Sequence, residues 1–498
     1  MRFGWARGGP SDARAVEPAV VLRYGAVRNR SRHSRSLCAV LFCAALGACG
    51  GGGQDPVNVS VDIDTSVTHQ TLEGFGAATA YQSSLLAGRT DDIFQVLFVD
   101  SGLDILRLGN WYQNKGTTDT TTPFGDNDAV QIVQKATAAR GGTPPKILMS
   151  SWTPPAYLKS NGVTRPPFGS GSSAPAGTLV QNGGEYAYGD FGDWWARSLQ
   201  AYAAEGVVPD WVSIQNEPDF FTSQWETCLF GPTEGANVAG IATAGYGEAL
   251  DAVSGAIQAA SLASPPVLLG PETTGFKGNI VQQYLNGLDP SKLGGIAHHL
   301  YGNTGDNPAP DTFNASMLDL ASSGASEGLP TFMTEYSPNA PTMFDSAWLI
   351  NNALTVENVS AYIYWELVWS TSTPPTGLVT IANPPATAPY TINDIYYALK
   401  HFARWTDPGW VRVDATSSVS AVRTSAFLSP EGTSLTLVLL NTGSQDHTVS
   451  VSPGALPFGT LTVYRSSGDS ERTTVVAPQS DGSIALPSRS IATVTYTP

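Results

Sequence analysis

The sequence predicts an α/β fold, a (β/α)8 TIM barrel with an appended all-β sandwich side domain. Between residues 71 and 407, short apolar segments alternate eight times with segments of helical periodicity, which is typical of such a barrel. From residue 408 the helical periodicity stops, and short valine- and threonine-rich segments alternate with turn residues, which indicates a sandwich. A chain of 498 residues is long enough to build both domains.

The barrel prediction depends on eight candidate strands and the helices that connect them. The strands are expected at Leu72–Ala78, Leu103–Leu108, Lys146–Ser151, Trp211–Gln215, Pro266–Gly270, Gly295–His299, Thr331–Thr334 and Ser360–Trp365. The helices are expected at Asp91–Val99, Ala129–Ala139, Phe191–Ala204, Ala239–Ala260, Ile280–Leu285, Ala315–Ala321, Ser346–Leu354 and Ile392–Phe402. The active site of such a barrel lies at the C-terminal ends of its strands.

The side domain is expected to combine both ends of the folded chain. Its main part spans residues 408–498, with strands expected at Val411–Val413, Ser420–Phe427, Ser434–Leu440, His447–Val451, Thr460–Tyr464 and Ile491–Tyr496. Residues 57–70 precede the barrel and alternate apolar with polar side chains, as a half-buried strand does. We therefore expect this segment to join the side domain.

The first 48 residues have the layout of a signal peptide. Several arginines precede the apolar run Leu37–Leu46, which is too short to cross a bilayer. Cys49 then follows in a bacterial lipoprotein pattern, and residues 49–56 read as a lipid anchor and glycine-rich tether. We expect an exported protein, either a lipoprotein of the outer membrane or cell surface or, if cleavage occurs nearby without lipidation, a secreted one.

The charge of the chain bears on its partners. Without residues 1–48, which hold eight arginines and two acids, 18 basic and 40 acidic residues remain, a formal charge of −22. Such a surface repels nucleic acid, and a neutral polymer is the better partner. Contact with a membrane is expected only through the possible lipid anchor at Cys49.

The cysteines predict neither a disulfide nor a zinc site. Cys38 and Cys43 lie in the signal segment, so only Cys228 remains in the folded part beside the anchor Cys49. Cys228 is expected to be a buried small hydrophobe. The histidines and glutamates also lack the spacing of a metal site, and we expect no cofactor.

Two strands deliver a glutamate at their C-terminal ends. Trp211–Pro218 ends in Asn216, Glu217 and a proline, and Leu329–Tyr336 ends in Glu335. Glycosidases place two carboxyl groups beside the bond that they cleave, with one protonated and the other ionised. Either glutamate alone could be an ordinary strand-end acid in a salt bridge or a helix cap. Both at the same end of a barrel favour a catalytic pair.

Further polar and aromatic residues follow the other predicted strands. They are Arg107, Trp152, Glu272, His298, His299, Tyr301, Trp365 and Glu366. Each has a structural alternative, because the charged groups could pair with one another and the tryptophans could simply pack. Together they suit a carbohydrate, because flat aromatic surfaces stack on the C–H faces of a sugar ring while polar groups bind its hydroxyls.

Four motifs resemble glycoside hydrolase family 30, from about residue 57 to the C-terminus. They are Gly74–Ala77, Ser213–Asp219, His298–Gly302 and Thr334–Tyr336. The resemblance implies Glu217 as the acid/base and Glu335 as the nucleophile of a retaining reaction, with Asn216 binding the sugar 2-hydroxyl. It also implies that Arg107 and Tyr301 steady the nucleophile and that Trp365 floors the subsite of the cleaved sugar. From their positions at strand ends we also expect Trp152 and His299 to bind substrate.

Within that family the sequence most resembles the xylan-cleaving branch, many of whose members bind a glucuronate side group through an arginine after strand eight. This chain has neither lysine nor arginine between Thr331 and Ala398, so a carboxylate would find no cation there. We expect an endo-β-1,4-xylanase-like enzyme that does not depend on glucuronate. The alternatives are a relative acting on β-1,6-glucan, β-1,6-galactan or a β-glucoside, and a surface lipoprotein that binds glycans without cleaving them.

Overall fold

A computed structural model of the chain describes residues 55–113, 127–165, 175–302, 307–382, 389–454, 459–468 and 472–498. Gln54–Pro498 form one compact unit. The predicted signal segment and Cys49 lie outside the described residues and stay predictions. Within the described part of the chain, no helix combines the length and apolar character needed to cross a bilayer.

Eight parallel strands close into a barrel in the order β12-β13-β14-β15-β2-β3-β4-β7. They are β2 (Gly74–Ala78), β3 (Ile105–Gly109), β4 (Lys146–Ser150), β7 (Trp211–Ser213), β12 (Val267–Thr273), β13 (Gly295–His299), β14 (Thr331–Glu335) and β15 (Val359–Tyr364). Each coincides with one of the eight predicted strands, and the predicted fold class is confirmed. The strands read as continuous apolar runs because parallel strands are buried on both faces.

The barrel interior has its own small apolar cluster, separate from the larger core between strands and helices. Its members are Ile105, Leu148, Trp211, Leu269, Ala297, Phe332, Ala361 and Ile363, which come from seven of the eight strands. The rings of Trp211 and Phe332 meet edge to face with centroids 5.6 Å apart. Side chains that fill a barrel in this way make it a packed core, so the polar groups gather at the strand ends.

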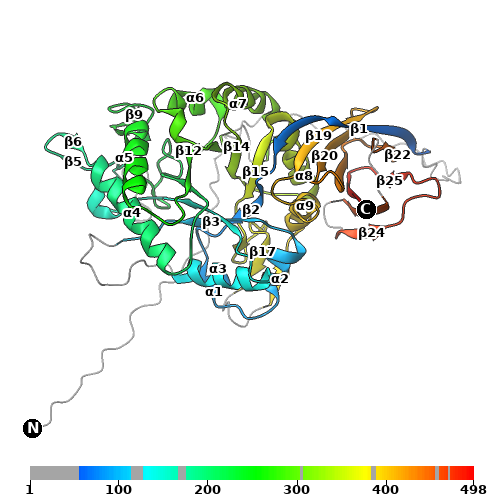
Figure 1. Cartoon of the computed structure of the whole chain (residues 1–498), viewed down its shortest axis with the longest axis horizontal. Coiled ribbons are helices and arrows are strands. Elements are labelled where there is room, and N and C mark those ends of the chain that lie inside the picture. Colours follow the sequence, from blue (N-terminus) through cyan, green and yellow to red (C-terminus); the bar gives the residue numbers. More distant parts are fainter. Residues whose placement is uncertain are drawn as a thin grey trace, which may run out of the picture. The chain divides into compact units, whose positions relative to one another are not determined.

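The helices cover the barrel from outside (Figure 1). They are α1 (Ser84–Ala87), α2 (Ile93–Gln95), α3 (Asn127–Ala139), α4 (Tyr188–Ala204), α5 (Tyr246–Ala259), α6 (Ile280–Leu285), α7 (Asn314–Glu327), α8 (Met343–Asn352) and α9 (Asp394–Ala403). The prediction of a helix from Ala239 is wrong, because α5 begins at Tyr246. Ala239 and Gly240 have φ of 48° and 88°, which no helix accommodates.

Several short strands lie in the loops of the barrel. They are β5 (Gln181–Asn182), β6 (Glu185–Tyr186), β8 (Phe230–Gly231), β9 (Asn237–Val238), β10 (Ile241–Ala242), β11 (Ala244–Gly245), β16 (Val368–Trp369), β17 (Val379–Ile381) and β18 (Tyr390–Ile392). The strands β9 and β10 have two residues each and pair antiparallel as a hairpin, in a region where a helix was predicted. The residues of this hairpin include turn formers, and its alanines wrongly indicated a helix.

The side domain is built from nine strands hydrogen-bonded in the order β24-β23-β26-β21-β20-β19-β1-β22-β25. They are β1 (Val57–Thr71), β19 (Val411–Ser417), β20 (Val422–Leu428), β21 (Leu435–Asn441), β22 (His447–Ser452), β23 (Thr460–Ser467), β24 (Thr474–Val476), β25 (Ile484–Leu486) and β26 (Ser490–Thr497). In Figure 1 the blue strand β1 lies beside orange β19, with which it pairs antiparallel. It pairs with β22 on its other edge, in parallel.

The barrel and the side domain share a buried contact on α9. His401 receives or donates hydrogen bonds at both ring nitrogens, with Thr493 Oγ1 at 2.8 Å and Ser466 Oγ at 2.9 Å. Burial lowers the pKa of His401 to about 3, so the ring is neutral. The ring of Trp405 stacks on that of Tyr464 with centroids 4.1 Å apart. These contacts fix the side domain against the helix that precedes it.

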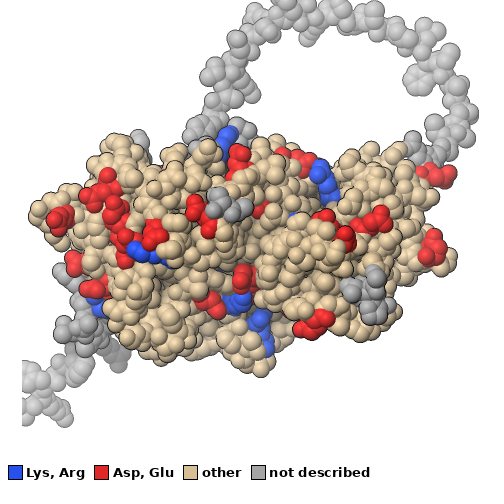
Figure 2. All heavy atoms as spheres, turned by 45° about the horizontal axis from the view of Figure 1, so that its top comes forward, with Lys and Arg blue, Asp and Glu red and all other residues tan. Residues whose placement is uncertain are grey.

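Acidic side chains predominate among the charged groups on one face of the molecule (Figure 2). Figure 2 shows one face, on which Asp and Glu cover more area than Lys and Arg and no continuous basic patch stands out. This distribution agrees with the formal charge of −16 for the whole chain. A nucleic acid, whose backbone needs neutralising cations, finds little to bind on this face.

Gly76 tests how closely the barrel strands pack. A Cβ atom at this position would lie 2.4 Å from the backbone oxygen of Ile105 and 2.7 Å from its Cβ. We expect Gly76→Ala to lower the free energy of unfolding by about 1–3 kcal/mol, the usual cost of overpacking. Urea denaturation followed by circular dichroism measures the change. Gly88→Ala, where a Cβ meets no atom within 4 Å, is the control and should change stability much less.

Candidate active site

The predicted site residues all lie at one end of the barrel, where its strands end. Arg107 belongs to β3, His299 is the last residue of β13, and Glu335 is the last residue of β14. Glu217 follows β7 by four residues and has φ of 47°, so its backbone turns sharply as the chain leaves the sheet. The amide of Glu217 donates to the backbone oxygen of Glu272 (3.0 Å), which fixes that turn to the neighbouring strand β12.

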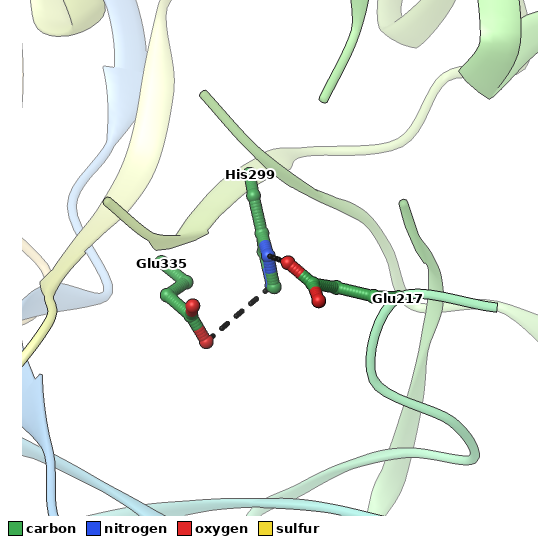
Figure 3. Close-up of side chains that lie close together, drawn as sticks. All are labelled: Glu217, His299 and Glu335. Carbon is green, nitrogen blue, oxygen red and sulfur yellow. Dashed lines mark hydrogen bonds and ion pairs between the residues drawn. The ribbon is translucent and has the colours of Figure 1, made fainter. Parts of the chain in front are cut away.

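Glu217 and Glu335 face each other across His299 (Figure 3). One oxygen of each carboxyl group and one ring nitrogen of His299 all lie within 4.8 Å of one another. His299 Nδ1 is 3.3 Å from Glu217 Oε1, and its Nε2 is 4.0 Å from Glu335 Oε2. Carboxyl groups about 5 to 5.5 Å apart suit a retaining double displacement at a sugar carbon, whereas inversion needs about 6.5 to 9.5 Å.

A buried arginine holds the polar groups in place. Arg107 is fully buried and donates through Nη1 to Glu335 Oε2 (2.5 Å) and through Nη2 to Asn216 Oδ1 (2.6 Å). Its Nη2 also lies 3.1 Å from Glu272 Oε1, and its Nε donates to Ser150 Oγ (3.3 Å). The rigid guanidinium therefore sets the relative positions of residues from four strand ends, as its planar fork of donors allows.

The two facing glutamates differ in their electrostatic surroundings. Burial raises the pKa of Glu217 well above its ordinary value, and the nearby charges of Glu335 and Asp219 raise it further. Burial also raises the pKa of Glu335, but the Arg107 guanidinium and a hydrogen bond from Tyr301 act against this. Because Arg107 bonds directly to Glu335, the shared proton of the pair belongs on Glu217.

His298 and His299 point into different environments. His299 faces the carboxyl pair, and burial together with the charge of Arg107 lowers its pKa well below the usual value, so it is neutral. His298 turns away, with Nε2 2.6 Å from Glu357 Oε1. Of the two histidines only His299 therefore lies at the site. Tyr301 lies next to it, with ring centroids 6.0 Å apart.

An aromatic cluster adjoins the carboxyl pair. Trp152 follows β4, and its ring lies 6.0 Å from that of Trp365, which follows β15. Arg107 adds a cation–π contact, with its guanidinium carbon 4.6 Å from the Trp152 ring centroid. The sequence reasoning missed two members. Tyr81 contacts Trp152 and Trp365 edge to face, and Trp111 stacks on Trp152 at 5.9 Å.

Both missed residues lie just beyond barrel strands. Tyr81 comes three residues after β2 and Trp111 two residues after β3. The position of each beyond a strand end was the available signal, since it follows the same rule that selected Trp152 and Trp365. The hydroxyl of Tyr81 donates to Glu226 Oε2 (2.8 Å), so this cluster also contacts the loop that follows Glu217.

Two further carboxyl groups are buried near the pair. Glu272 accepts from Ser150 Oγ (3.1 Å) and contacts Arg107, which matches the pairing considered from the sequence. Glu366 accepts from the backbone amide of Tyr81 (2.8 Å), and burial raises its pKa well above the usual value. Both are fully buried, so neither side chain is exposed to solvent.

Glu217, His299 and Glu335 have the ligand types and spacing that could hold a divalent cation. The surrounding residues fit this poorly, because the Arg107 guanidinium already bonds to Glu335 Oε2. A cation would have to share that oxygen with the Arg107 guanidinium, and the two positive charges would repel each other. The arrangement is better suited to proton transfer and nucleophilic attack.

The chain is similar to several known proteins. Residues 409–494 match the family described as Glycosyl hydrolase family 30 beta sandwich domain. The chain is 25% identical to Endo-1,6-beta-D-glucanase neg1 of Aspergillus fumigatus, over 81% of this chain and 85% of that protein. It is 24% identical to Glucuronoxylanase XynC of Bacillus subtilis, over 80% and 82% of the two chains.

Among solved structures, the catalytic domain of GH30 xylanase C from Talaromyces cellulolyticus has the same fold. The TM-score is 0.69 at 20% sequence identity, over 88% of this chain and all of that one. At this identity the likeness concerns the fold, so the arrangement of barrel and side domain is shared while the substrate is not decided.

The raised pKa of Glu217 predicts that the wild type and Glu217→Gln differ in stability by an amount that depends on pH. A buried carboxyl whose pKa is raised on folding favours the native state at low pH, and this contribution is lost as pH rises towards the folded pKa. We expect Glu217→Gln to be more stable than the wild type at pH 7, because the amide is neutral in both the folded and the unfolded chain. Chemical denaturation at pH 7 and pH 4 measures this.

The difference should shrink at pH 4, where the unfolded carboxyl also binds its proton. Asp62→Asn is the control, because Asp62 is exposed on β1, away from the barrel. A Glu217→Gln variant that is no more stable than the wild type at pH 7 would contradict the assignment of the proton to Glu217.

Proposed function

We propose that this chain is a retaining glycosidase of glycoside hydrolase family 30 that cleaves β-1,4-xylan and does not depend on glucuronate side groups. The observation that carries the proposal is the facing pair Glu217 and Glu335, with one oxygen of each within 4.8 Å of the other. We propose Glu217 as the acid/base and Glu335 as the nucleophile. Arg107 and Tyr301 orient Glu335. The residues that bind substrate are Trp152, Asn216, His299 and Trp365.

The reaction proceeds in two displacements. Glu335 attacks the anomeric carbon while Glu217 transfers its proton to the departing glycosidic oxygen, so the C–O bond to the leaving chain breaks as an ester bond forms. Water then attacks the same carbon, Glu217 takes a proton from that water, and the ester to Glu335 breaks. Two inversions give a product that retains the β-configuration.

The charge on Glu335 controls the proton on Glu217. While Glu335 is ionised, its charge helps to raise the pKa of Glu217, and Glu217 is therefore ready to act as an acid. Formation of the glycosyl ester removes that charge, so the pKa of Glu217 falls and its carboxylate can act as a base. One residue thereby serves both steps because its partner changes charge between them.

Asn216 and the aromatic residues complete the substrate site. Asn216 Oδ1 accepts from Arg107, which orients the side-chain amide and directs its nitrogen away from the guanidinium. We propose that this nitrogen donates to the sugar 2-hydroxyl, whose hydrogen bonds strengthen in the transition state. Trp365, which is only partly buried beside Trp152, offers a flat apolar surface for the ring of the cleaved sugar.

A second substrate class has support of its own. The relative from Aspergillus fumigatus, an endo-1,6-beta-D-glucanase, is as similar to this chain as the glucuronoxylanase of Bacillus subtilis is. The proposed chemistry is the same for β-1,6-glucan, because the two carboxyl groups act only on the anomeric carbon and the bridging oxygen. Loops that shape the leaving side decide between the substrates. The absence of lysine and arginine between Thr331 and Ala398 favours an uncharged chain in either case.

The mechanism predicts retention and a characteristic response to azide. Proton NMR of an early time course should show the β-anomer as the first product. Glu217→Ala should lower turnover on polymer by about 10²- to 10⁴-fold, the usual contribution of general acid–base catalysis. Azide should restore turnover of an activated aryl glycoside and yield a β-glycosyl azide, because azide attacks the glycosyl ester without needing a base.

Glu335→Gln serves as the matched variant, since it leaves the acid in place and removes the nucleophile. It should be inactive and should not respond to azide. An α-anomer as first product from the wild type would contradict the proposed double displacement.

The substrate proposal predicts similar rates on unsubstituted linear xylan and on glucuronoxylan. No cation in residues 331–398 can bind a side-chain carboxylate, so the acid group adds nothing to binding. Release of reducing ends from both xylans and from linear β-1,6-glucan, measured side by side, tests this. Cleavage of glucuronoxylan alone would refute independence from the acid group. Cleavage of the glucan alone would replace xylan by the second substrate.

A further inference from the structure

The loop that follows Glu217 exposes a pair of aromatic rings. Phe220 and Trp225 stack with centroids 6.1 Å apart and ring planes at 27°. Phe220 is 37% exposed and Trp225 is partly exposed. Among the large hydrophobic side chains that are exposed in the described residues, Phe220 is the only aromatic one. Two exposed rings forgo the free energy that their burial would contribute to stability. Such exposure favours a role in binding.

The loop is attached to the site at its start. The amide of Phe220 donates to the backbone oxygen of Glu217 (3.1 Å), so the backbone of Phe220 is one tight turn away from the acid. Asp219, between them, accepts from both the backbone amide and the hydroxyl of Thr274 at 2.9 and 3.1 Å. These bonds connect the loop to the end of β12 and hold Phe220 close to Glu217.

The loop is attached to the site at its other end as well. Glu226, the neighbour of Trp225, accepts from the Tyr81 hydroxyl (2.8 Å). Tyr81 in turn contacts Trp365, with ring centroids 6.0 Å apart. The loop that carries the stacked pair is therefore attached to the acid at one end and to the aromatic cluster at the other. A surface that is fixed before binding costs less conformational entropy when a ligand arrives.

We propose that Phe220 and Trp225 bind the sugar ring on the leaving side of the cleaved bond. This inference rests on the proposed function, in which Glu217 protonates the leaving oxygen. The leaving sugar must lie on the flank of that acid, and the loop with the exposed pair extends from the same residue. An apolar aromatic face suits the C–H face of an uncharged pyranose.

The leaving side takes part in both steps of the reaction. In the first step it holds the part of the polymer that departs. In the second step it is empty or holds an acceptor, and an acceptor sugar bound there competes with water for the glycosyl ester. Loss of the platform should therefore weaken polymer binding and also reduce transfer to an oligosaccharide acceptor.

Phe220→Ala and Trp225→Ala test the proposal on two substrates. The first is linear xylan or β-1,6-glucan, whichever the wild type cleaves, and the second is a nitrophenyl glycoside of the matching disaccharide. On polymer we expect KM to rise roughly 3- to 10-fold for each variant, the worth of one aromatic contact. The aryl substrate has no sugar on the leaving side, so its kcat/KM should fall at least threefold less.

The fraction of product formed by transfer to an added oligosaccharide should fall as well, by a similar factor. Trp225→Phe keeps an aromatic ring and should restore most of both properties. Leu318→Ala removes an exposed apolar side chain on the outer helix α7 and should change neither. Circular dichroism of each variant shows whether the fold is intact.

The outcomes separate the two proposals. A wild type that cleaves no β-glycan refutes the proposed function. An active wild type whose alanine variants lose activity equally on polymer and aryl substrate, or keep full transfer to acceptor, refutes the platform while leaving the function in place.

Discussion

The site depends on one buried guanidinium. Arg107 has no exposed surface, and a charge so placed is costly unless it is paired and fully hydrogen-bonded. Here Glu335, Asn216, Glu272 and Ser150 all meet it, and each comes from a different strand or strand end. The closed barrel makes this possible, since it brings the C-terminal ends of distant segments to one rim. Removing any one partner would leave a buried charge poorly compensated.

The Arg107 guanidinium gives two chemically identical side chains, Glu217 and Glu335, different electrostatic surroundings. Glu217 and Glu335 are both buried, and burial alone would raise the pKa of both. Arg107 bonds to Glu335 directly, whereas the neutral His299 is the polar neighbour of Glu217. A charged neighbour favours ionisation and a neutral one does not. The proposed acid and the proposed nucleophile are thus distinguished by their positions relative to one cation.

The sequence predicted the barrel well because parallel strands are continuous apolar runs, and all eight are present. It also predicted that Glu217 and Glu335 would share one rim, because barrel closure places every C-terminal strand end there. It missed Tyr81 and Trp111, although both lie just beyond strand ends as Trp152 and Trp365 do, because periodicity does not show which loop residues turn back toward the site. It also failed at the start of α5, because the helical pattern includes Ala239, whose positive φ depends on local turn geometry.

The charges around the pair suit a reaction in which positive charge develops on a sugar. Glu217, Glu272, Glu335 and Glu366 surround a single arginine, and His299 adds no charge because it is neutral. Raised pKa values leave protons on Glu217 and Glu366, so the site avoids excessive repulsion before substrate binds. In the proposed reaction, an oxocarbenium-like carbon that develops beside Glu335 would meet carboxylate oxygens that are fixed in advance. Such fixed charge stabilises a transition state more than mobile solvent does, because nothing has to reorganise.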